Sequence, residues 1–439
     1  MSSDPLQRRQ RVGALGRWLF LAALIVAIIT LVALLLTIVN DSFGLVALRN
    51  ARQPEELAQQ AAAPGQRLAD LPKPTLIAIL QANISHNRGR KLERDQRFLA
   101  DALVFNTPAE WEQACAAAEP PAGCDAPARS QADVYRLVLQ EVVQPEVLET
   151  WSLAESLFNR PQLTAATAER YPNARLEFRA WLSADFVTGP QASEAQYAGV
   201  RTAILGSLWV ILITISVAFP LGIGAAIYLE EYAGDTRLNR IIQTNIYNLA
   251  GVPSIIYGML GLAIFVRFME PLTSGALFRA AADPATVTGR TILSAGLTLA
   301  LLVLPLIIIN AQEAIRAVPG SLRQASLGLG ATRWQTVWSH VLPSALPGIL
   351  TGAILSISRA IGETAPLIVV GVSTFIAVDP DGPFSKYTTL PAQIYQWTAR
   401  PQGEFRHIAA AASLVLLILL LSLNASAILI RNRSSRARA

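Results

Sequence analysis

Two opposite charges four residues apart, Arg359 and Glu363, interrupt a long apolar stretch that reads SISRAIGETAPLIVV. On a helix, residues four apart share a face and can form an ion pair, and a charge within a membrane span usually marks a functional site. The planar guanidinium of arginine offers parallel donors to an oxyanion, and a carboxylate beside it weakens binding enough to allow release. Two interpretations stay open: a contact on a path for an anion, or a structural pair that locks this helix against a neighbour.

The elements that carry this pair belong to a membrane protein. The chain has 439 residues, of which 52% are hydrophobic and only 15% charged, and its mean hydropathy is +0.39. That composition is too apolar for an ordinary soluble protein. Six apolar runs are long enough to cross about 30 Å of hydrocarbon as helices. They are Trp18–Val39, Thr202–Leu229, Ile241–Val266, Thr291–Gln312, Val341–Val378 and Ile408–Ile430. We therefore predict an all-α membrane protein with six transmembrane helices.

Two of these runs differ from an ordinary span, one in its length and one in its position near the start of the sequence. Val341–Val378, which holds the charge pair, has 38 residues and is too long for one straight span. We expect a kink at Pro366, because proline lacks an N–H and clashes with the preceding turn. Trp18–Val39 is longer than a typical signal-peptide core and no small-residue cleavage site follows it promptly, so we expect a retained span.

Arginines cluster at both ends of the chain. Residues 1–17 and 431–439 form two basic tails, which contain Arg8, Arg9, Arg11 and Arg17, and Arg431, Arg433, Arg436 and Arg438. Basic residues that flank membrane spans favour the cytoplasmic side. Both termini are therefore expected in the cytoplasm, which requires an even number of spans and agrees with six.

Residues 40–200 are then expected outside the cytoplasm, as a domain inserted between the first span (18–39) and a five-helix core (201–430). The segment opens with a linker-like stretch rich in Ala, Gln and Pro. The rest is predicted to be mainly helical, with one strand. The helices are expected near 92–103, 108–118, 130–143 and 146–159, and the strand within 174–183.

The only two cysteines of the sequence, Cys115 and Cys124, fall in this inserted segment. A disulfide between them is expected in an oxidising compartment, and two free thiols are the alternative. Residues 40–200 carry 15 basic and 20 acidic side chains, and the remainder carries 21 basic and 11 acidic ones. The basic charge thus lies at the membrane edges, where it serves topology and lipid contacts and not nucleic-acid binding.

Signatures of catalysis are missing from the sequence. It contains no Gly-Lys pair and so no P-loop, no Gly-x-Ser-x-Gly elbow, and three histidines without metal-ligand spacing, His86, His340 and His407. We expect no cofactor and no metal. The chain is predicted to be a pore or a receptor, not an enzyme, that takes its energy from another protein.

The loop at residues 313–343 reads EAIRAVPGSLRQASLGLGATRWQTVWSHVLP and is expected in the cytoplasm. Residues 319–338 are compatible with helix, with Pro319 at the start and a glycine turn at Gly328 and Gly330. Thr332 is a candidate cap for a second short helix. Trp334, Val337 and Trp338 fall at i, i+3 and i+4, so we expect one apolar face that either docks into a groove on a partner or lies in the membrane interface.

This loop resembles the one in importer permeases of the ATP-binding-cassette (ABC) type, which follows the pattern Glu-Ala-Ala, three residues, Gly, nine residues, Ile, any residue, Leu-Pro. The matching positions are Gln324, Ala325, Ser326, Gly330, His340, Leu342 and Pro343. Gln324, Ser326 and His340 depart from the favoured residue types, whereas the spacing agrees throughout. The stretches NLAGVPSIIYGMLGLAIFV, IYLEEYA and SRAIGETAPLIVVG are similar to the PstA family of phosphate-specific permeases. The resemblance covers residues 201–430 well and does not cover 40–200.

The resemblance implies a fold, a function and a set of partners. The chain would be one permease of a bacterial inner-membrane phosphate importer, with Arg359 and Glu363 on the path for inorganic phosphate. A PstC-like permease would form the other half of the pore, two copies of a PstB-like ATPase would dock on the loop, including Trp334, and a PstS-like binding protein would deliver phosphate. A permease for molybdate or sulfate, and a membrane-anchored sensor of a periplasmic ligand, are the alternatives.

Overall fold

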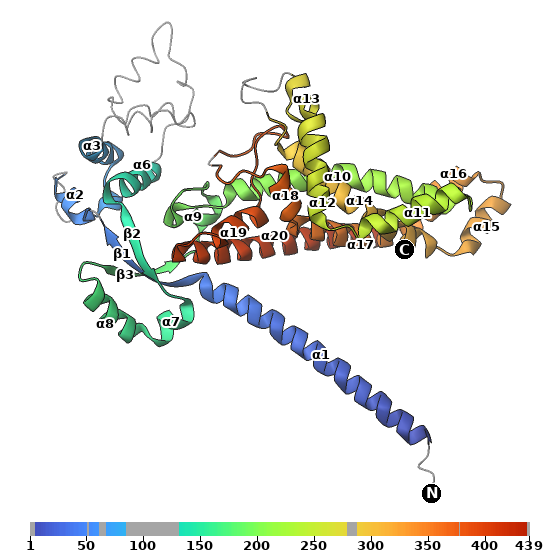
Figure 1. Cartoon of the computed structure of the whole chain (residues 1–439), viewed down its shortest axis with the longest axis horizontal. Coiled ribbons are helices and arrows are strands. Elements are labelled where there is room, and N and C mark those ends of the chain that lie inside the picture. The colour runs from blue at the N-terminus through green and yellow to red at the C-terminus, as the bar shows by residue number, and fades with distance from the viewer. Residues whose placement is uncertain are drawn as a thin grey trace. The chain divides into compact units, whose positions relative to one another are not determined.

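The computed structural model describes residues 5–50, 52–60, 67–84, 131–278, 288–376 and 378–436. The chain divides into two compact units, a membrane unit of residues 1–43 with 180–439 and an inserted unit, Gly44–Arg179 (Figure 1). The inserted unit is shorter than the expected segment 40–200, because the residues from Ala180 onward pack with the membrane helices.

The membrane unit consists of helices that are interrupted at several points by π-helical turns. The longer helices are α1 (Pro5–Asp41), α10 (Arg201–Ile227), α11 (Arg237–Ala250), α14 (Ile292–Arg316), α17 (Leu342–Gly362) and α20 (Gly403–Arg436). The shorter ones are α9 (Ala184–Thr188), α12 (Ser254–Gly261), α13 (Glu270–Thr273), α15 (Gly320–Gly328), α16 (Arg333–Thr336), α18 (Ala365–Val370) and α19 (Leu390–Thr398). The π-helical turns extend α10 to Tyr232 and α12 to Phe268, and join α16 to α17.

In the described part of the chain, five helical stretches are long and apolar enough to cross a membrane. They are Gly16–Asp41, Arg201–Tyr232, Ile292–Arg316, Arg333–Gly362 and Gly403–Arg433. A sixth span exists if α11 and α12 together form one, but these two helices meet at an angle of 104°. The run Ile241–Val266 is therefore not the straight span that we expected. The bend lies at Gly251–Pro253, where proline removes a backbone donor and disfavours helix in the residue before it.

Helix α14 lies at the centre of this unit, with 67% of its most apolar window buried, and contacts α10, α11, α12 and α17. Gly348 and Gly352 of α17 allow the close approach, because a Cβ at either position would collide with Ala314 or Asn310 of α14. Without a hydrophobic force between helices in lipid, small residues at such crossings provide the van der Waals contact.

The expected break in the fifth apolar run lies slightly earlier than Pro366. Helix α17 ends at Gly362, Glu363 has extended backbone angles (φ −74°, ψ 114°), and α18 begins at Ala365 with Pro366 in its first turn. Proline fits the first turn of a helix, where its missing N–H has no partner within the helix, so Pro366 lies at the start of α18 and not at a kink inside one continuous helix.

The inserted unit contains a small sheet and several helices. Among its described residues, three strands form a sheet in the order β2-β1-β3, from β1 (Phe43–Asn50), β2 (Pro145–Thr150) and β3 (Arg175–Ala180). Strands β1 and β2 are antiparallel, with Val46 opposite Thr150 and an irregularity between Ala47 and Leu48. The helices are α2 (Pro54–Gln60), α3 (Lys73–Asn83), α6 (Gln131–Val138), α7 (Leu153–Phe158) and α8 (Arg160–Arg170).

Some expectations for this segment hold and others do not. The strand expected within 174–183 is β3, and the helix expected near 130–143 is α6 with its π-helical continuation to Val143. The helix expected at 146–159 was wrong in its first half, which is strand β2; α7 begins only after Ser152, which caps it together with Glu155. The helices expected at 92–103 and 108–118, and both cysteines, lie outside the described residues.

Candidate functional site

The loop between α14 and α17 contains the two short helices that its glycine turn predicted. Helix α14 ends at Arg316, α15 follows directly after Pro319, and α16 begins after Thr332. Thr332 and Gln335 form a reciprocal cap, in which the Thr332 hydroxyl accepts from the Gln335 N–H at 3.3 Å and the Gln335 side chain accepts from the Thr332 N–H at 2.9 Å. This arrangement fixes the start of α16 at the predicted cap.

The turn between the two helices depends on Gly330. Its φ is +88°, a conformation that side chains disfavour, and a Cβ at this position would meet no atom within 4 Å. Glycine is therefore required for the backbone angle and not for space. The neighbouring Leu329 is 90% exposed, so this turn presents an apolar side chain at the surface.

Ser326 and Thr336 join α15 to α16. Their hydroxyl oxygens lie 2.9 Å apart, and both side chains are buried. Ser326 departs from the alanine favoured at this position of the loop pattern, and the structure gives the serine hydroxyl a partner. Gln324 and Ala325 are exposed on the other side of α15.

The tryptophans of the loop form an exposed stacked pair. The rings of Trp334 and Trp338 lie 5.6 Å apart, nearly parallel, and both side chains are exposed. Val337, which we expected on the same face, is buried. That expectation was wrong for the valine because residues 337–341 form a π-helical turn, which does not follow the 3.6-residue period. Leu342 and Pro343 lie at the start of α17 and are half-buried.

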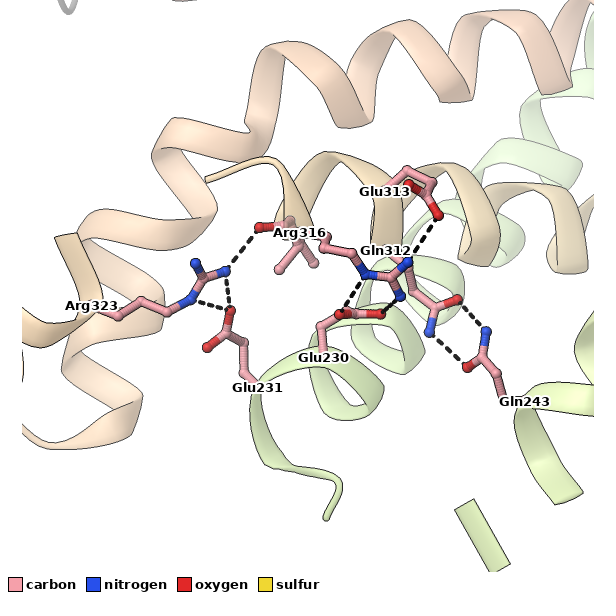
Figure 2. Close-up of polar contacts among 8 residues, drawn as sticks. Glu230, Glu231, Gln243, Gln312, Glu313, Arg316 and Arg323 are labelled. Atoms are coloured by element: carbon pink, nitrogen blue, oxygen red, sulfur yellow. Dashed lines mark hydrogen bonds and ion pairs between the residues drawn. The ribbon is translucent and has the colours of Figure 1, made fainter. Parts of the chain in front are cut away.

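A group of polar contacts connects α15 to the ends of two membrane helices (Figure 2). The guanidinium of Arg323, on α15, donates to the Glu231 carboxylate from Nε at 2.9 Å and from Nη2 at 2.7 Å. It also donates to the backbone carbonyls of Ile315 and Val318 at 2.9 and 2.7 Å, at the end of α14. One side chain thus joins α15, α14 and the π-helical turn that ends α10.

Two neighbouring contacts hold α10 and α11 to α14 without involving α15. Arg316 donates to both oxygens of Glu230, at 2.6 and 3.4 Å, and pairs with Glu313 at 3.1 Å. Gln243 of α11 and the buried Gln312 exchange two amide hydrogen bonds at 2.9 and 3.0 Å. Sequence reasoning missed these roles, and the available signal was a pair of glutamates at the end of an apolar span.

Arg359 and Glu363 lie where α17 ends. Arg359 belongs to the last helical turn and Glu363 is the residue that caps it, and their side chains pair with Nε 3.3 Å from Oε1. Arg359 is 52% exposed in the single chain, whereas Glu363 is only 17% exposed. The guanidinium is therefore held by one carboxylate and still presents donors away from the core of its own chain.

Other polar side chains of α17 are turned toward neighbouring helices. The Ser358 hydroxyl donates to the Asn424 side chain of α20 at 2.6 Å, and Asn310 of α14 lies 3.4 Å from the Ser356 hydroxyl. These contacts fix the rotation of α17 and so the direction in which Arg359 points. Within the described ranges, no three or more His, Cys, Asp or Glu side chains are grouped so that they could hold a metal ion.

Comparison with known proteins decides the family. The family model described as "Binding-protein-dependent transport system inner membrane component" matches residues 218–438. The chain belongs to this family. Members are permease subunits of ABC transporters and not enzymes, and ATP hydrolysis takes place on a separate subunit.

Several relatives are similar to about half of this chain. The probable ABC transporter permease protein YqgI of Bacillus subtilis (strain 168) is 34% identical over 241 residues, which are 53% of this chain and 76% of that protein. The phosphate transport system permease protein PstA 1 of Mycobacterium tuberculosis (strain ATCC 25618 / H37Rv) is 36% identical over 243 residues, 55% of this chain and 72% of that protein. Among solved structures, the MetNI methionine ABC transporter in an inward-facing conformation matches 54% of this chain and 94% of its own, with 18% identity and a TM-score of 0.38.

Proposed function

We propose that this permease is one half of the translocation path of an ATP-driven importer of inorganic phosphate. The observation that carries the proposal is its identity of 36% to a phosphate transport system permease over almost three quarters of that relative. Further relatives that carry the PstA name are 30–37% identical to the chain. The residue pair at the end of α17, Arg359 partly balanced by the carboxylate of Glu363, suits a divalent oxyanion that must bind and leave again.

The permease is a multi-pass inner-membrane protein, since its family is the inner-membrane component of these systems and its helices are long and apolar. We place both basic tails in the cytoplasm and the inserted unit, Gly44–Arg179, outside it. Residues 40–200 have five more acidic than basic side chains, which would repel phosphate at long range. We therefore assign this segment a docking or shielding role at the outer mouth and not the high-affinity phosphate site.

Family membership implies that the permease works with an ATPase, a substrate-binding protein and a second permease. We propose that these are the PstB-like, PstS-like and PstC-like subunits of a phosphate system. The ATPase would dock on the surface formed by Leu329, Trp334 and Trp338, because exposed aromatic and apolar side chains on a short helical element suit insertion into a groove. In this arrangement Gln324 and Ala325 face the ATPase, while Ser326 holds the two short helices together.

We assign Arg359 as the contact for phosphate on the translocation path and Glu363 as its partner when the path is empty. Arginine suits this role because its fork can donate two parallel hydrogen bonds to one oxyanion. Its half-exposed position in the single chain supports a direction toward the second permease, since a lipid-facing guanidinium would be unfavourable.

The experiment that tests the proposal is purification of the tagged chain in mild detergent, followed by identification of the proteins that co-purify and by an uptake assay in cells that lack their own phosphate importers. The proposal predicts a second permease, an ATPase and a binding protein, and uptake of phosphate that excess sulfate or molybdate does not reduce. If excess sulfate or molybdate abolishes the uptake, the permease would be assigned to that oxyanion and not to phosphate. A chain that co-purifies with a signalling protein and gives no uptake would favour the sensor.

A further inference from the structure

We propose that the Arg323–Glu231 pair is the link that makes the loop helix α15 and the membrane helix α10 move together, so that both residues are positioning residues for coupling. The proposal rests on the proposed function, because it assumes that an ATPase acts on this loop. It assigns a role to two residues of the membrane unit that do not belong to the docking surface or to the anion path. Figure 2 shows Glu231, in the π-helical turn that ends α10, and Arg323, on α15.

The link is needed because α15 has a short covalent connection to only one of the two membrane helices. Three residues, Ala317–Pro319, separate α15 from α14, so movement of α15 reaches α14 through the backbone. Helix α10 is far away along the chain, since Glu231 and Arg323 are 92 positions apart. The contact between these two side chains therefore provides a direct route by which α15 can pull on the end of α10.

The geometry of the link makes it firm. Arg323 uses Nε and Nη2 on one carboxylate oxygen and Nη1 and Nη2 on two backbone carbonyls at the end of α14. The side chains of Arg323 and Glu231 are only 24% and 11% exposed. Hydrogen bonds between charged groups are stronger than neutral ones, and water screens them less when they are partly buried. The pair can therefore carry a displacement that an exposed surface ion pair would not.

The π-helical turn Tyr228–Tyr232 explains why α10 can make this contact and a second one beside it. Successive residues of a regular α-helix point about 100° apart, so two adjacent glutamates face different directions. In the π-helical turn, Glu230 reaches Arg316 at the end of α14 and Glu231 reaches Arg323 on α15. Single π-helical turns are frequent at functional sites.

The neighbouring Glu230–Arg316 pair provides a matched comparison. It has the same residue types, but it joins α10 to α14 and involves no residue of α15. Loss of this pair weakens the packing of the two membrane helices without cutting the route from α15. If the link works as proposed, removing the Glu231–Arg323 pair uncouples the loop, and removing the Glu230–Arg316 pair does not.

The test uses the complete transporter in lipid nanodiscs with its partner subunits. The double variant Glu231→Met with Arg323→Met removes both members of the link, so no charge is left unpaired; Glu230→Met with Arg316→Met is the control. The first readout is the stimulation of ATP hydrolysis by the loaded binding protein. We expect a loss of about tenfold in the link variant and a change within about twofold in the control, since energetic coupling between sites commonly amounts to about 5–150-fold.

The second readout is a distance and does not depend on the transported substrate. Spin labels on Ser321→Cys and Asp235→Cys, with the native cysteines replaced by serine, report the separation of α15 from the end of α10 with and without vanadate-trapped nucleotide. In the wild-type protein and in the Glu230→Met with Arg316→Met control, the distance between the two labels should be the same with and without trapped nucleotide. In the link variant, this distance should change or its distribution should become broader. If the assignment of phosphate fails but the link is real, this difference remains.

Two results would overturn the proposal. The first is a link variant that keeps its stimulation and its single distance. The second is an equal loss in both double variants, which would make the pair a stabiliser of the fold only. If the double variant does not assemble, Glu231→Gln takes its place with Glu230→Gln as control, because glutamine keeps the size and one acceptor of glutamate. A broader distance distribution in Glu231→Gln alone supports the link, and unchanged distances in both contradict it.

Discussion

The hydroxyls of Ser326 and Thr336 lie 2.9 Å apart and are buried where α15 meets α16. Ser326→Ala leaves the Thr336 hydroxyl without this partner, so we expect a loss of about 1–3 kcal/mol in the free energy of unfolding. The double change with Thr336→Val removes both polar groups and should recover much of that loss. Thermal unfolding of the purified chain measures both effects. Ser339→Ala, at an exposed hydroxyl, is the control, and equal stability of Ser326→Ala and wild type would contradict the prediction.

Gly330 forms the turn of the loop, with φ at +88° and open space around it. We expect Gly330→Asp to insert into the membrane normally but to abolish transport and the coupling of ATP hydrolysis. A left-handed residue that is not glycine costs about 1–2 kcal/mol, less for asparagine, so Gly330→Asn should retain more uptake than Gly330→Ala. Gly328→Ala is the control, since Gly328 has open space and no positive φ. Normal uptake by Gly330→Asp would show that this turn is not needed for coupling.

The stacked pair of Trp334 and Trp338 is predicted to anchor the ATPase. Trp334→Ala with Trp338→Ala should reduce the amount of ATPase that co-purifies by at least about tenfold, because buried tryptophans are frequent hot spots of interfaces. Phe268, another exposed aromatic side chain outside this loop, gives the control change Phe268→Ala. The prediction fails if the two variants retain the same amount of ATPase.

Residues 40–200 are predicted to be accessible from outside the cytoplasm, with Cys115 and Cys124 joined in a disulfide. In intact, unreduced cells, a membrane-impermeant thiol reagent should label neither cysteine, and after mild reduction it should label both. Labelling of both cysteines without reduction would exclude the disulfide. Labelling only after the cytoplasmic side is opened would overturn the topology.

Arg359 and Glu363 are best tested together, because removal of one leaves the other charge unpaired. If Arg359 contacts phosphate, the double variant Arg359→Leu with Glu363→Leu should assemble and still fail to transport. Arg359→Lys should also assemble but transport poorly, since lysine keeps the charge without the fork. Near-normal phosphate uptake by a well-assembled double variant would leave these residues as a structural pair.

Local signals in the sequence predicted the parts of the site that depend on neighbouring residues. Gly330 predicted a turn and Thr332 predicted a helix cap, and both residues have these roles in the structure. The spacing of Arg359 and Glu363 allowed their pairing, which is present at 3.3 Å. The burial of Val337 was missed, because the period of a regular helix does not apply to a π-helical turn.

Features that depend on distant residues were not predictable in the same way. The Glu231–Arg323 contact joins positions 92 apart, and no local pattern states which arginine a glutamate meets. Strand β1 was not predicted, because it is defined by pairing with the distant strand β2, and β2 itself was taken for the start of a helix. The bend between α11 and α12 had a local signal at Pro253, but the length of the apolar run outweighed it.

The most direct test of the account is ATP-dependent accumulation of labelled phosphate in proteoliposomes that contain this permease, the second permease, the ATPase and the loaded binding protein. We predict accumulation that requires ATP and is lost in Gly330→Asp. Unlabelled phosphate should reduce this accumulation, and the same concentration of sulfate or molybdate should not. Accumulation of sulfate or molybdate in place of phosphate, or no accumulation by a fully assembled and ATP-hydrolysing complex, would contradict the assignment.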